Sequence, residues 1–391
     1  MVLRAYRYRI YPTEEQKQFF DHHFGCCRFV YNHFLALRSE KWKSGHISLS
    51  GFACKKMLPD LKAEHPWLKD VNSQSLQASV LNLEMAFRRF FRGLGRYPSF
   101  HRKHGRQSFL VPQHLSVGDR QITIPKLGTP VKVKMHRPLG GKPKGLTIVR
   151  ECSGKYYVSI VCECEIPHLP TVQSTVGIDL NLGDYAVLSS GEKIPHPKWL
   201  KTAEHRLIRL QRRLSRKVKG SNNRQKAKNK VGRLHEKIRN QRRDFQHKLS
   251  YKVVNENQVI SLEGLLVRNM VKNRHLAKSI SDSGWSEFAG MVKYKASWYG
   301  RAVKVIGTFE PSSKECSICH YINRDLKLSQ RVWVCPDCGT VHDRDHNASV
   351  NIDSIGQDMP ELTPAERMAS AVSVLSMRQV ASKKQEASSP N

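Results

Sequence analysis

The spacing of apolar residues divides the chain into segments of different structure. Residues 3–11 alternate apolar and basic side chains with a period of two, which is typical of a strand. Pro12 ends this strand, and residues 13–16 form a capping box that predicts the start of a helix. Helical spacing of apolar side chains then continues to about residue 92. These patterns predict a strand that leads into an all-helical segment.

The period returns to two between residues 108 and 165, where short apolar runs are separated by Gly and Pro turns. This pattern predicts a small β-barrel. We expect the strand at 3–11 to join it, so that the helical segment is an insertion within a β-domain. Residues 166–174 are predicted to be a linker to the next domain.

Two carboxylates follow apolar strands in the second half of the chain. One apolar run ends at Asp179 and is followed by a turn and a strand at 185–188, an arrangement that opens an RNase H-like fold. Another apolar strand ends at Glu263. Helical spacing that breaks at 220–223 predicts two antiparallel helices between them, and a further helix is predicted after Asp345.

The net charge of the chain limits the classes of partner that it is expected to bind. The 391 residues are enough for two or three domains, and 66 Lys and Arg against 33 Asp and Glu give a formal net charge of +33. Such a surplus repels itself unless a polyanion neutralises it. Thermophilic proteins enrich residues of both signs, whereas one sign is in excess here. We therefore expect a nucleic-acid partner, with a ribosomal-type surplus as the alternative.

Two stretches concentrate the positive charge. Residues 88–106 contain seven Lys and Arg, no acidic residue and four interleaved aromatic side chains, which suits phosphate contact and base stacking. Residues 201–250 hold 18 Lys and Arg against three acidic residues, which favours a clamp on a phosphate backbone. The alternatives are a solvated helix end with core aromatics and a solvated helical hairpin. The candidate nucleic-acid contacts are Arg88, Arg89, Arg92, Arg96, Arg212, Arg213, Arg216, Lys217, Lys219, Arg239, Arg242 and Arg243.

Four of the ten cysteines have the spacing of a zinc site. Cys316 and Cys319 form one C-x-x-C pair, and Cys335 and Cys338 form a second. Four thiolates close a tetrahedral site without an open position for water, so we expect one structural zinc ion. We interpret the other six as buried small hydrophobic residues: Cys26, Cys27, Cys54, Cys152, Cys162 and Cys164.

Three acidic residues are candidates for a magnesium centre. Asp179 and Glu263 end apolar strands, and Asp345 opens a predicted helix shortly after the zinc ligands. Two divalent ions about 4 Å apart, held by carboxylates, carry out in-line cleavage of phosphodiesters, and Mg²⁺ prefers such hard oxygen ligands. Any one of these residues alone would be interpreted as a helix cap or a turn residue.

No run of about 18 apolar residues is present, so we expect no transmembrane span. The first residues contain no apolar segment of the kind found in signal peptides. We therefore expect a cytoplasmic, nucleoid-associated prokaryotic protein, and a monomer.

A series of motifs, in the right order, resembles the TnpB family of RNA-guided nucleases, which IS200/IS605-type transposons encode and which are compact relatives of Cas12 effectors. The resemblance covers the chain to about residue 355. The motifs are CCRFVYN at 26–32, GIDLNLG at 177–183, LSRKVKGSNN at 214–223, DFQHKLS at 244–250, SLEGLLVRNM at 261–270, SISDSGWSEF at 279–288, YKASWYGR at 294–301, the two C-x-x-C pairs, and HDRDHNASVNI at 342–352.

The resemblance implies an α+β multidomain fold. The implied domains are a wedge β-barrel at 1–12 and 107–170, an inserted helical recognition domain at 13–106, a RuvC-like (RNase H) nuclease domain at 171–310 and 341–355, a zinc ribbon at 311–340 and a tail at 356–391, which we expect to be disordered.

The resemblance also implies an RNA-guided DNA endonuclease. Its guide RNA would come from the right end of the transposon and pair with double-stranded target DNA beside a short transposon-adjacent motif. By position, Asp179, Glu263 and Asp345 correspond to the family's catalytic acids, which would hold two Mg²⁺ ions. Asp343 would be either a helix-entry residue or a residue that holds a metal ligand in place. The basic hairpin would hold the RNA–DNA hybrid.

Ser73 and Gln77, one helical turn apart, are candidates for recognising the adjacent motif, because glutamine can pair bidentately with adenine. Ordinary helix-surface residues are the alternative. The chain departs from the family at Gly264, where Asp or His is common, and at Leu266, where Asn is common. Neither change removes a candidate metal ligand, so we predict an active nuclease. Two other functions remain open: a transposase that joins strands with the same metal chemistry, and a non-catalytic zinc-ribbon repressor.

Overall fold

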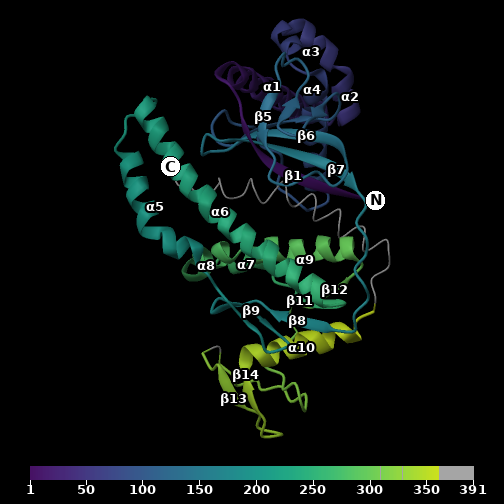
Figure 1. The fold of residues 1–391 in the computed structure, drawn as a ribbon, viewed down its shortest axis with the longest axis vertical. Coiled ribbons are helices and arrows are strands. Elements are labelled where there is room, and N and C mark those ends of the chain that lie inside the picture. The colour runs from purple at the N-terminus through teal and green to yellow at the C-terminus, as the bar shows by residue number, and fades with distance from the viewer. Residues whose placement is uncertain (309, 328, 361–391) are drawn as a thin grey trace. The chain divides into compact units, whose positions relative to one another are not determined.

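The computed structural model describes residues 1–308, 310–327 and 329–360 (Figure 1). Its contacts divide the chain into two compact units. Unit 1 comprises residues 1–165 with 218–233, and unit 2 comprises residues 166–217 and the described residues from 234 onward. The predicted tail at 356–391 lies outside the described residues from 361, and its first residues continue a helix instead.

Unit 1 contains an antiparallel sheet of seven strands in the order β2-β6-β7-β1-β5-β4-β3. As predicted, the N-terminal strand joins this sheet, where it pairs with β7 and β5. Strands β2 and β3 lie at the two ends of this order, and among the described residues no pairing joins them, so the pairing order of the predicted β-barrel is open. The strands are β1 (Val2–Tyr11), β2 (Gln107–Val111), β3 (Ser116–Val117), β4 (Gln121–Thr123), β5 (Val131–Lys134), β6 (Lys142–Arg150) and β7 (Tyr156–Cys164).

A helical segment lies between β1 and β2 in the chain, as the change of periodicity predicts. The capping box is present: the Gln16 amide donates to Thr13 Oγ1 at 3.3 Å, and the Thr13 amide donates to Gln16 Oε1 at 3.1 Å. The elements are α1 (Glu14–Gly45), α2 (Gly51–Lys56), α3 (Leu58–Glu64), the 3₁₀ helix η1 (Pro66–Asp70) and α4 (Ser73–Phe91).

Unit 2 contains a mixed sheet of five strands in the order β10-β9-β8-β11-β12. The strands are β8 (Thr175–Asp179), β9 (Asp184–Leu188), β10 (Lys193–Pro195), β11 (Val259–Glu263) and β12 (Ala302–Ile306). The first three form an antiparallel meander, while β11 runs parallel to both β8 and β12. Asp179 and Glu263 therefore end neighbouring parallel strands at the same edge of the sheet.

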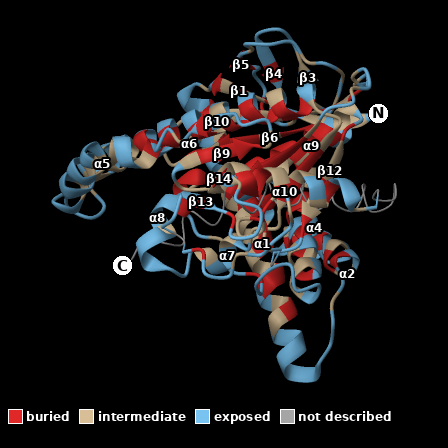
Figure 2. Cartoon of the chain, turned by 90° about the horizontal axis from the view of Figure 1, so that it is seen from below, coloured by how far each residue is buried: buried red, intermediate tan, exposed pale blue. Residues whose placement is uncertain are grey.

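The helices of unit 2 pack on this sheet around a core that includes Tyr185, Trp285 and Phe288. They are α5 (Trp199–Ser215), α6 (Asn222–Glu256), whose residues up to 233 belong to unit 1, α7 (Val267–Met270), α8 (Arg274–Ser283) and α9 (Trp285–Tyr299). A further helix, α10 (Arg344–Asp358), packs against β8 and β11 and contributes no residue to this core. The hairpin predicted at 201–250 forms α5 and α6, and most of α5 is exposed (Figure 2). A two-stranded hairpin, β13 (Val332–Val334) and β14 (Val341–Asp343), carries the second cysteine pair between its strands.

Five of the six cysteines outside the zinc spacing are buried, as predicted, while Cys152 is partly exposed. A search of the described helices found none with the length and apolar character needed to cross a membrane.

Glycines allow α10 to lie directly on the sheet (Figure 1). A Cβ atom built at Gly177 of β8 would lie well inside 3.0 Å of the Ser349 carbonyl oxygen of α10. A Cβ atom at Gly356 of α10 would likewise collide with the side chain of Ser261 on β11. Because α10 carries Asp345 in its first turn, this close packing sets the distance from Asp345 to the edge of the sheet.

We predict that Gly177→Ala destabilises unit 2 by about 1–3 kcal/mol, because the added methyl group meets helix backbone that cannot rotate away. Urea unfolding would measure the loss, and hydrogen exchange should increase across α10. The control is Gly128→Ala, since a Cβ atom there meets nothing within 4 Å. Equal stability of the two variants would contradict this account of the packing.

Candidate active site

Asp179 is a buried carboxylate at the end of β8. Its side chain is 9% exposed, and its Oδ2 accepts a hydrogen bond of 3.1 Å from Asn181 Nδ2. Asn181 is itself held in place, because its Oδ1 accepts the backbone amides of Gly183 and Asp184, each at 2.9 Å. The turn after β8 therefore orients Asn181, whose side chain donates a hydrogen bond to Asp179.

The pKa of Asp179 shows which charged groups lie near its carboxyl group. This pKa is raised from 3.8 to about 7, chiefly by burial and also by the carboxylates of Glu263 and Asp345, against the opposing effects of Asn181 and Arg344. The fold thus brings the three predicted acids within electrostatic reach of one another from distant parts of the chain. A buried cluster of this kind is short of positive charge, and a divalent cation would supply it.

Glu263 lies at the end of the adjacent strand. Burial raises its pKa, while a hydrogen bond of 3.2 Å from Ser312 Oγ to Oε1 acts in the opposite direction. Ser312 lies at the start of the predicted zinc ribbon (311–340). The sequence offered no signal for this contact, because an isolated serine outside any motif has no distinguishing pattern.

Asp345 lies in the first turn of α10, and Asp343 caps this helix. Asp343 Oδ1 accepts the amides of Asp345 at 3.2 Å and His346 at 3.0 Å, and Lys193 Nζ lies 2.7 Å from Oδ2. Although burial raises the pKa of Asp343, these hydrogen bonds lower it below its usual value. The helix-entry role predicted for Asp343 agrees with this geometry. The Asp345 carboxylate takes no part in the cap, because Arg331 Nη1 donates to both of its oxygens, at 3.0 and 3.1 Å.

The three carboxylates do not form a single compact ligand set. Within the described residues, the one group of three or more His, Cys, Asp or Glu with ligand atoms mutually within 4.8 Å is the four cysteines. Carboxylates shared between two ions about 4 Å apart extend over a wider region than the ligands of one ion. Among the described residues, the carboxylate oxygens of Asp179, Glu263 and Asp345 therefore do not lie at the mutual spacing expected for the ligands of one ion.

The four predicted zinc ligands do come together. Cys316 Sγ lies 3.6 Å from Cys338 Sγ, and Cys319 Sγ lies 3.5 Å from Cys335 Sγ. Four sulfur atoms at these separations suit a tetrahedral zinc ion with no open position.

His342 is a further residue beside the cysteines that the sequence did not single out. Its Nε2 lies 3.0 Å from Cys316 Sγ, and its ring packs beside Trp333. Burial lowers the pKa of His342, so the neutral ring can donate an N–H to a thiolate.

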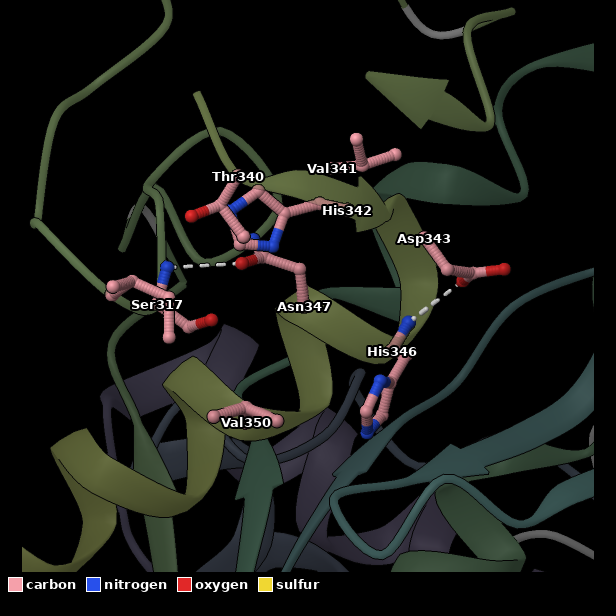
Figure 3. A pocket seen from close by; sticks show the side chains of 9 residues that line it. Ser317, Thr340, Val341, His342, Asp343, His346, Asn347 and Val350 are labelled. Atoms are coloured by element: carbon pink, nitrogen blue, oxygen red, sulfur yellow. Dashed lines mark hydrogen bonds between the residues drawn. The ribbon is translucent and has the colours of Figure 1, made fainter. Parts of the chain in front are cut away.

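Hydrogen bonds connect the predicted zinc ribbon to α10 beside a small cavity (Figure 3). Asn347 Oδ1 accepts the Ser317 amide at 3.0 Å, and Asn347 Nδ2 donates to the Glu315 carbonyl at 2.6 Å. One helical turn later, Asn351 donates to the carbonyls of Ser312 and Glu315, each at 2.8 Å. The cavity of about 280 Å³ lies between these contacts and β14. The two asparagines couple the position of the ribbon to the helix that carries Asp345.

The candidate nucleic-acid contacts fall into different environments. Arg212, Arg213 and Arg216 are exposed on α5. Arg242 instead is buried, and its Nη1 donates to the carbonyls of Ser281 and Asp282 at 3.2 and 3.1 Å. Its guanidinium is used inside unit 2, so we no longer propose it as a phosphate contact.

The remaining candidates are partly engaged or exposed. Arg243 is ion-paired with Glu287 at 2.6 Å and Arg88 with Glu84 at 3.1 Å. Ser73 accepts a hydrogen bond of 2.6 Å from Lys62 Nζ. Gln77, Arg89 and Arg239 are partly exposed, whereas Arg92, Arg96, Lys217 and Lys219 are exposed.

Family models match most of the chain. Residues 159–274 match the OrfB_IS605 model, described as a probable transposase, and residues 285–352 match a Cas12f1-like TNB domain. Residues 1–46 match a helix-turn-helix domain model, although in the structure they form β1 and the single helix α1.

Relatives extend the match to nearly the whole chain. A protein of Streptomyces pristinaespiralis named "Putative RNA-guided DNA endonuclease" is 41% identical over 361 residues, which cover 91% of this chain and 90% of that protein. "Putative RNA-guided DNA endonuclease InsQ" of Escherichia coli strain K12 is 34% identical, with 90% and 92% covered. A chain from the cryo-EM structure of the Cas12f1–sgRNA–target DNA complex aligns with a TM-score of 0.56 at 12% identity, covering 87% of this chain and 83% of that one, which indicates a shared fold.

The raised pKa of Asp179 predicts a pH-dependent cost of folding. The folded-state pKa of about 7 exceeds the unfolded value of 3.8, so the cost is absent below the unfolded value, grows as pH rises towards 7 and is complete above it. In magnesium-free buffer, Asp179→Asn should therefore stabilise the protein, by at most about 4 kcal/mol at pH 8 and by less at pH 5. Urea unfolding at both pH values would measure this. The control is Asp343→Asn, whose lowered pKa predicts the opposite sign, with a loss of stability that fades as the pH falls.

Proposed function

We propose, since this chain belongs to the OrfB_IS605 family of TnpB-type proteins, that it is an RNA-guided DNA endonuclease. Relatives that are 41% and 34% identical span about nine tenths of this chain and carry that activity in their names. The observation that carries the proposal is the acidic centre. A soluble binding protein has no need to bury Asp179 beside two further carboxylates, because the arrangement costs folding free energy.

The chain's own acids fit the chemistry of phosphodiester cleavage. Asp179, Glu263 and Asp345 would hold two Mg²⁺ ions, which when bound neutralise charge on the scissile phosphate and activate a water molecule. Near neutral pH the Asp179 carboxyl retains a proton part of the time, and binding of a cation would release that proton. Asn181 and Ser312 would keep the carboxylates of Asp179 and Glu263 oriented.

The proposed partners are a guide RNA and a double-stranded DNA target. The guide would derive from the right end of the transposon, and base pairing would supply sequence specificity while the protein contacts the backbone. We propose that Ser73 and Gln77 at the start of α4 contribute to recognition of the adjacent motif. The ammonium of Lys62, which donates to Ser73 Oγ, adds a positive charge at that position.

One exposed face of α5 is the strongest candidate for contact with a nucleic-acid backbone. Arg209, Arg212, Arg213 and Arg216 surround a surface hollow of about 400 Å³ together with His205 and Ile208. Because these side chains repeat at helical spacing on one side of the helix, their guanidinium groups can follow successive phosphates. We name these four arginines the α5 arginine face.

A transposase is the second candidate, since the OrfB_IS605 model is itself described as a probable transposase. The two functions differ in product and in cofactor requirement. Incubation of the protein with transposon ends in the absence of RNA would yield joined strands if it were a transposase. An RNA-guided nuclease yields cut DNA, and only when a matching guide is present.

Removal of any one carboxylate of the centre should abolish cleavage without loss of RNA binding. We expect Asp179→Asn, Glu263→Gln and Asp345→Asn each to reduce the rate of guided DNA cleavage by at least about 100-fold, because each removes a ligand of the divalent ions. Cleavage of a target plasmid by the purified protein–RNA complex would measure this. Sequencing of the RNA that copurifies would identify the guide.

The matched control is Asp337→Asn, which removes one acidic charge from an exposed position in the ribbon. This variant should cleave at close to the wild-type rate. If Asp179→Asn cleaved DNA as fast as Asp337→Asn, the endonuclease centre would not be where we propose it.

Neutralisation of the α5 arginine face should weaken RNA binding in a salt-dependent manner. For the triple variant Arg212→Gln, Arg213→Gln and Arg216→Gln, the slope of log K against log salt concentration should fall in magnitude by about 2, because three phosphate contacts are lost. Filter binding over a range of NaCl concentrations would measure the slope. Arg242→Gln is the contrasting variant: its arginine is buried, so stability should fall while the slope is retained. An unchanged slope in the triple variant would remove this face from the interface.

A further inference from the structure

Arg331 holds the carboxylate of Asp345 from the direction of the ribbon. Its Nη1 donates to Oδ1 at 3.0 Å and to Oδ2 at 3.1 Å, so both oxygens that could bind a cation are engaged by one guanidinium nitrogen. The Asp345 side chain is 21% exposed and that of Arg331 is 59% exposed. The ion pair therefore lies at the rim of the acidic centre, with the arginine on the solvent side.

The backbone of Arg331 is held by the ribbon hairpin, while its side chain is largely exposed. The Arg344 amide donates to the Arg331 carbonyl at 2.8 Å, and the next residue, Val332, pairs with Asp343 in the β13–β14 hairpin. The ribbon hairpin thus places the start of this side chain opposite the first turn of α10. Because the backbone is held and the side chain is exposed, the guanidinium can leave the carboxylate for another partner without any change of fold.

We propose that Arg331 is a positioning residue that occupies the Asp345 carboxylate until a divalent cation displaces it. The inference rests on the proposed function in one respect, namely that Asp345 binds a cation. The guanidinium of Arg331 is positively charged, and its backbone is held by the ribbon hairpin, so it orients the Asp345 side chain. Its charge also reduces the repulsion between the Asp345 carboxylate and those of Asp179 and Glu263. It also competes with the incoming ion, so the nucleic-acid-free protein binds divalent ions less tightly than the acids alone would allow.

The strength of this competition is limited by solvent. Ion pairs between exposed side chains are weak, so removal of the guanidinium should strengthen cation binding by about 2–5-fold rather than by orders of magnitude. Salt screens exposed charges, so the difference should shrink at high ionic strength. Both features separate competition at Asp345 from a general loss of folding, which would weaken cation binding instead.

The test is Mn²⁺ binding to the full-length, zinc-loaded protein without nucleic acid, followed by electron paramagnetic resonance. Arg331→Gln should bind Mn²⁺ about 2–5-fold more tightly than the wild type at low salt. Arg324→Gln is the matched control, because it removes the same charge from an exposed arginine of the same ribbon and should leave the affinity unchanged. Unchanged or weaker Mn²⁺ binding in Arg331→Gln, or an equal gain in Arg324→Gln, would overturn the proposal.

A double-mutant cycle shows whether the effect passes through Asp345. In an Asp345→Asn background, titrated to millimolar Mn²⁺, replacement of Arg331 should no longer change the affinity, and a retained gain would overturn the proposal. Failure of this inference is distinguishable from failure of the proposed function. If Asp179→Asn abolishes guided cleavage while Arg331→Gln leaves Mn²⁺ binding unchanged, the nuclease stands and the competing role of Arg331 falls.

Discussion

The burial of one negative charge, that of Asp179, is the constraint on which the centre depends. A carboxylate at the end of an interior strand loses its hydration, and two further carboxylates nearby increase the cost of its ionised form. Native stability is a small difference between large terms, so a cost of this kind persists when it serves a function. Here the described structure offsets the cost only in part, through the amide of Asn181 and the positive charge of Arg344, and a bound cation would offset the remainder.

Close packing converts that constraint into a geometry. The parallel pairing of β8 with β11 places Asp179 and Glu263 at one edge of the sheet. Asp345 comes to the same edge because α10 lies directly on the strands, which is possible only where Gly177 and Gly356 lack side chains. A bulkier residue at either position would lift the helix, and the third carboxylate would move with it.

The ribbon has more than one physical connection to the centre. Ser312 at its start donates to Glu263, Arg331 beside its hairpin donates to Asp345, and Asn347 and Asn351 of α10 hold its first turn by backbone contacts. The four cysteines could hold one metal ion, and such an ion would make the ribbon a stiff support because it would fix all four ligands at once. The ribbon therefore stabilises the part of the centre that the sheet does not reach.

Local patterns were enough to predict several of the elements and the clustering of the four cysteines. The capping box at Thr13, the alternation in β1 and β7 and the two C-x-x-C pairs all act over a few residues, so the sequence by itself determined them. The three acids were candidates from their positions at strand ends and a helix start, and the family resemblance assigned them a role, since no local pattern separates a metal ligand from a helix cap. The tertiary structure alone decided that the seven-stranded sheet has an open pairing order, that Arg242 is buried, and that Ser312 and Arg331 approach the acids. Such contacts join residues from distant parts of the chain, and strand pairing and helix packing create them without leaving a periodic signal along the sequence.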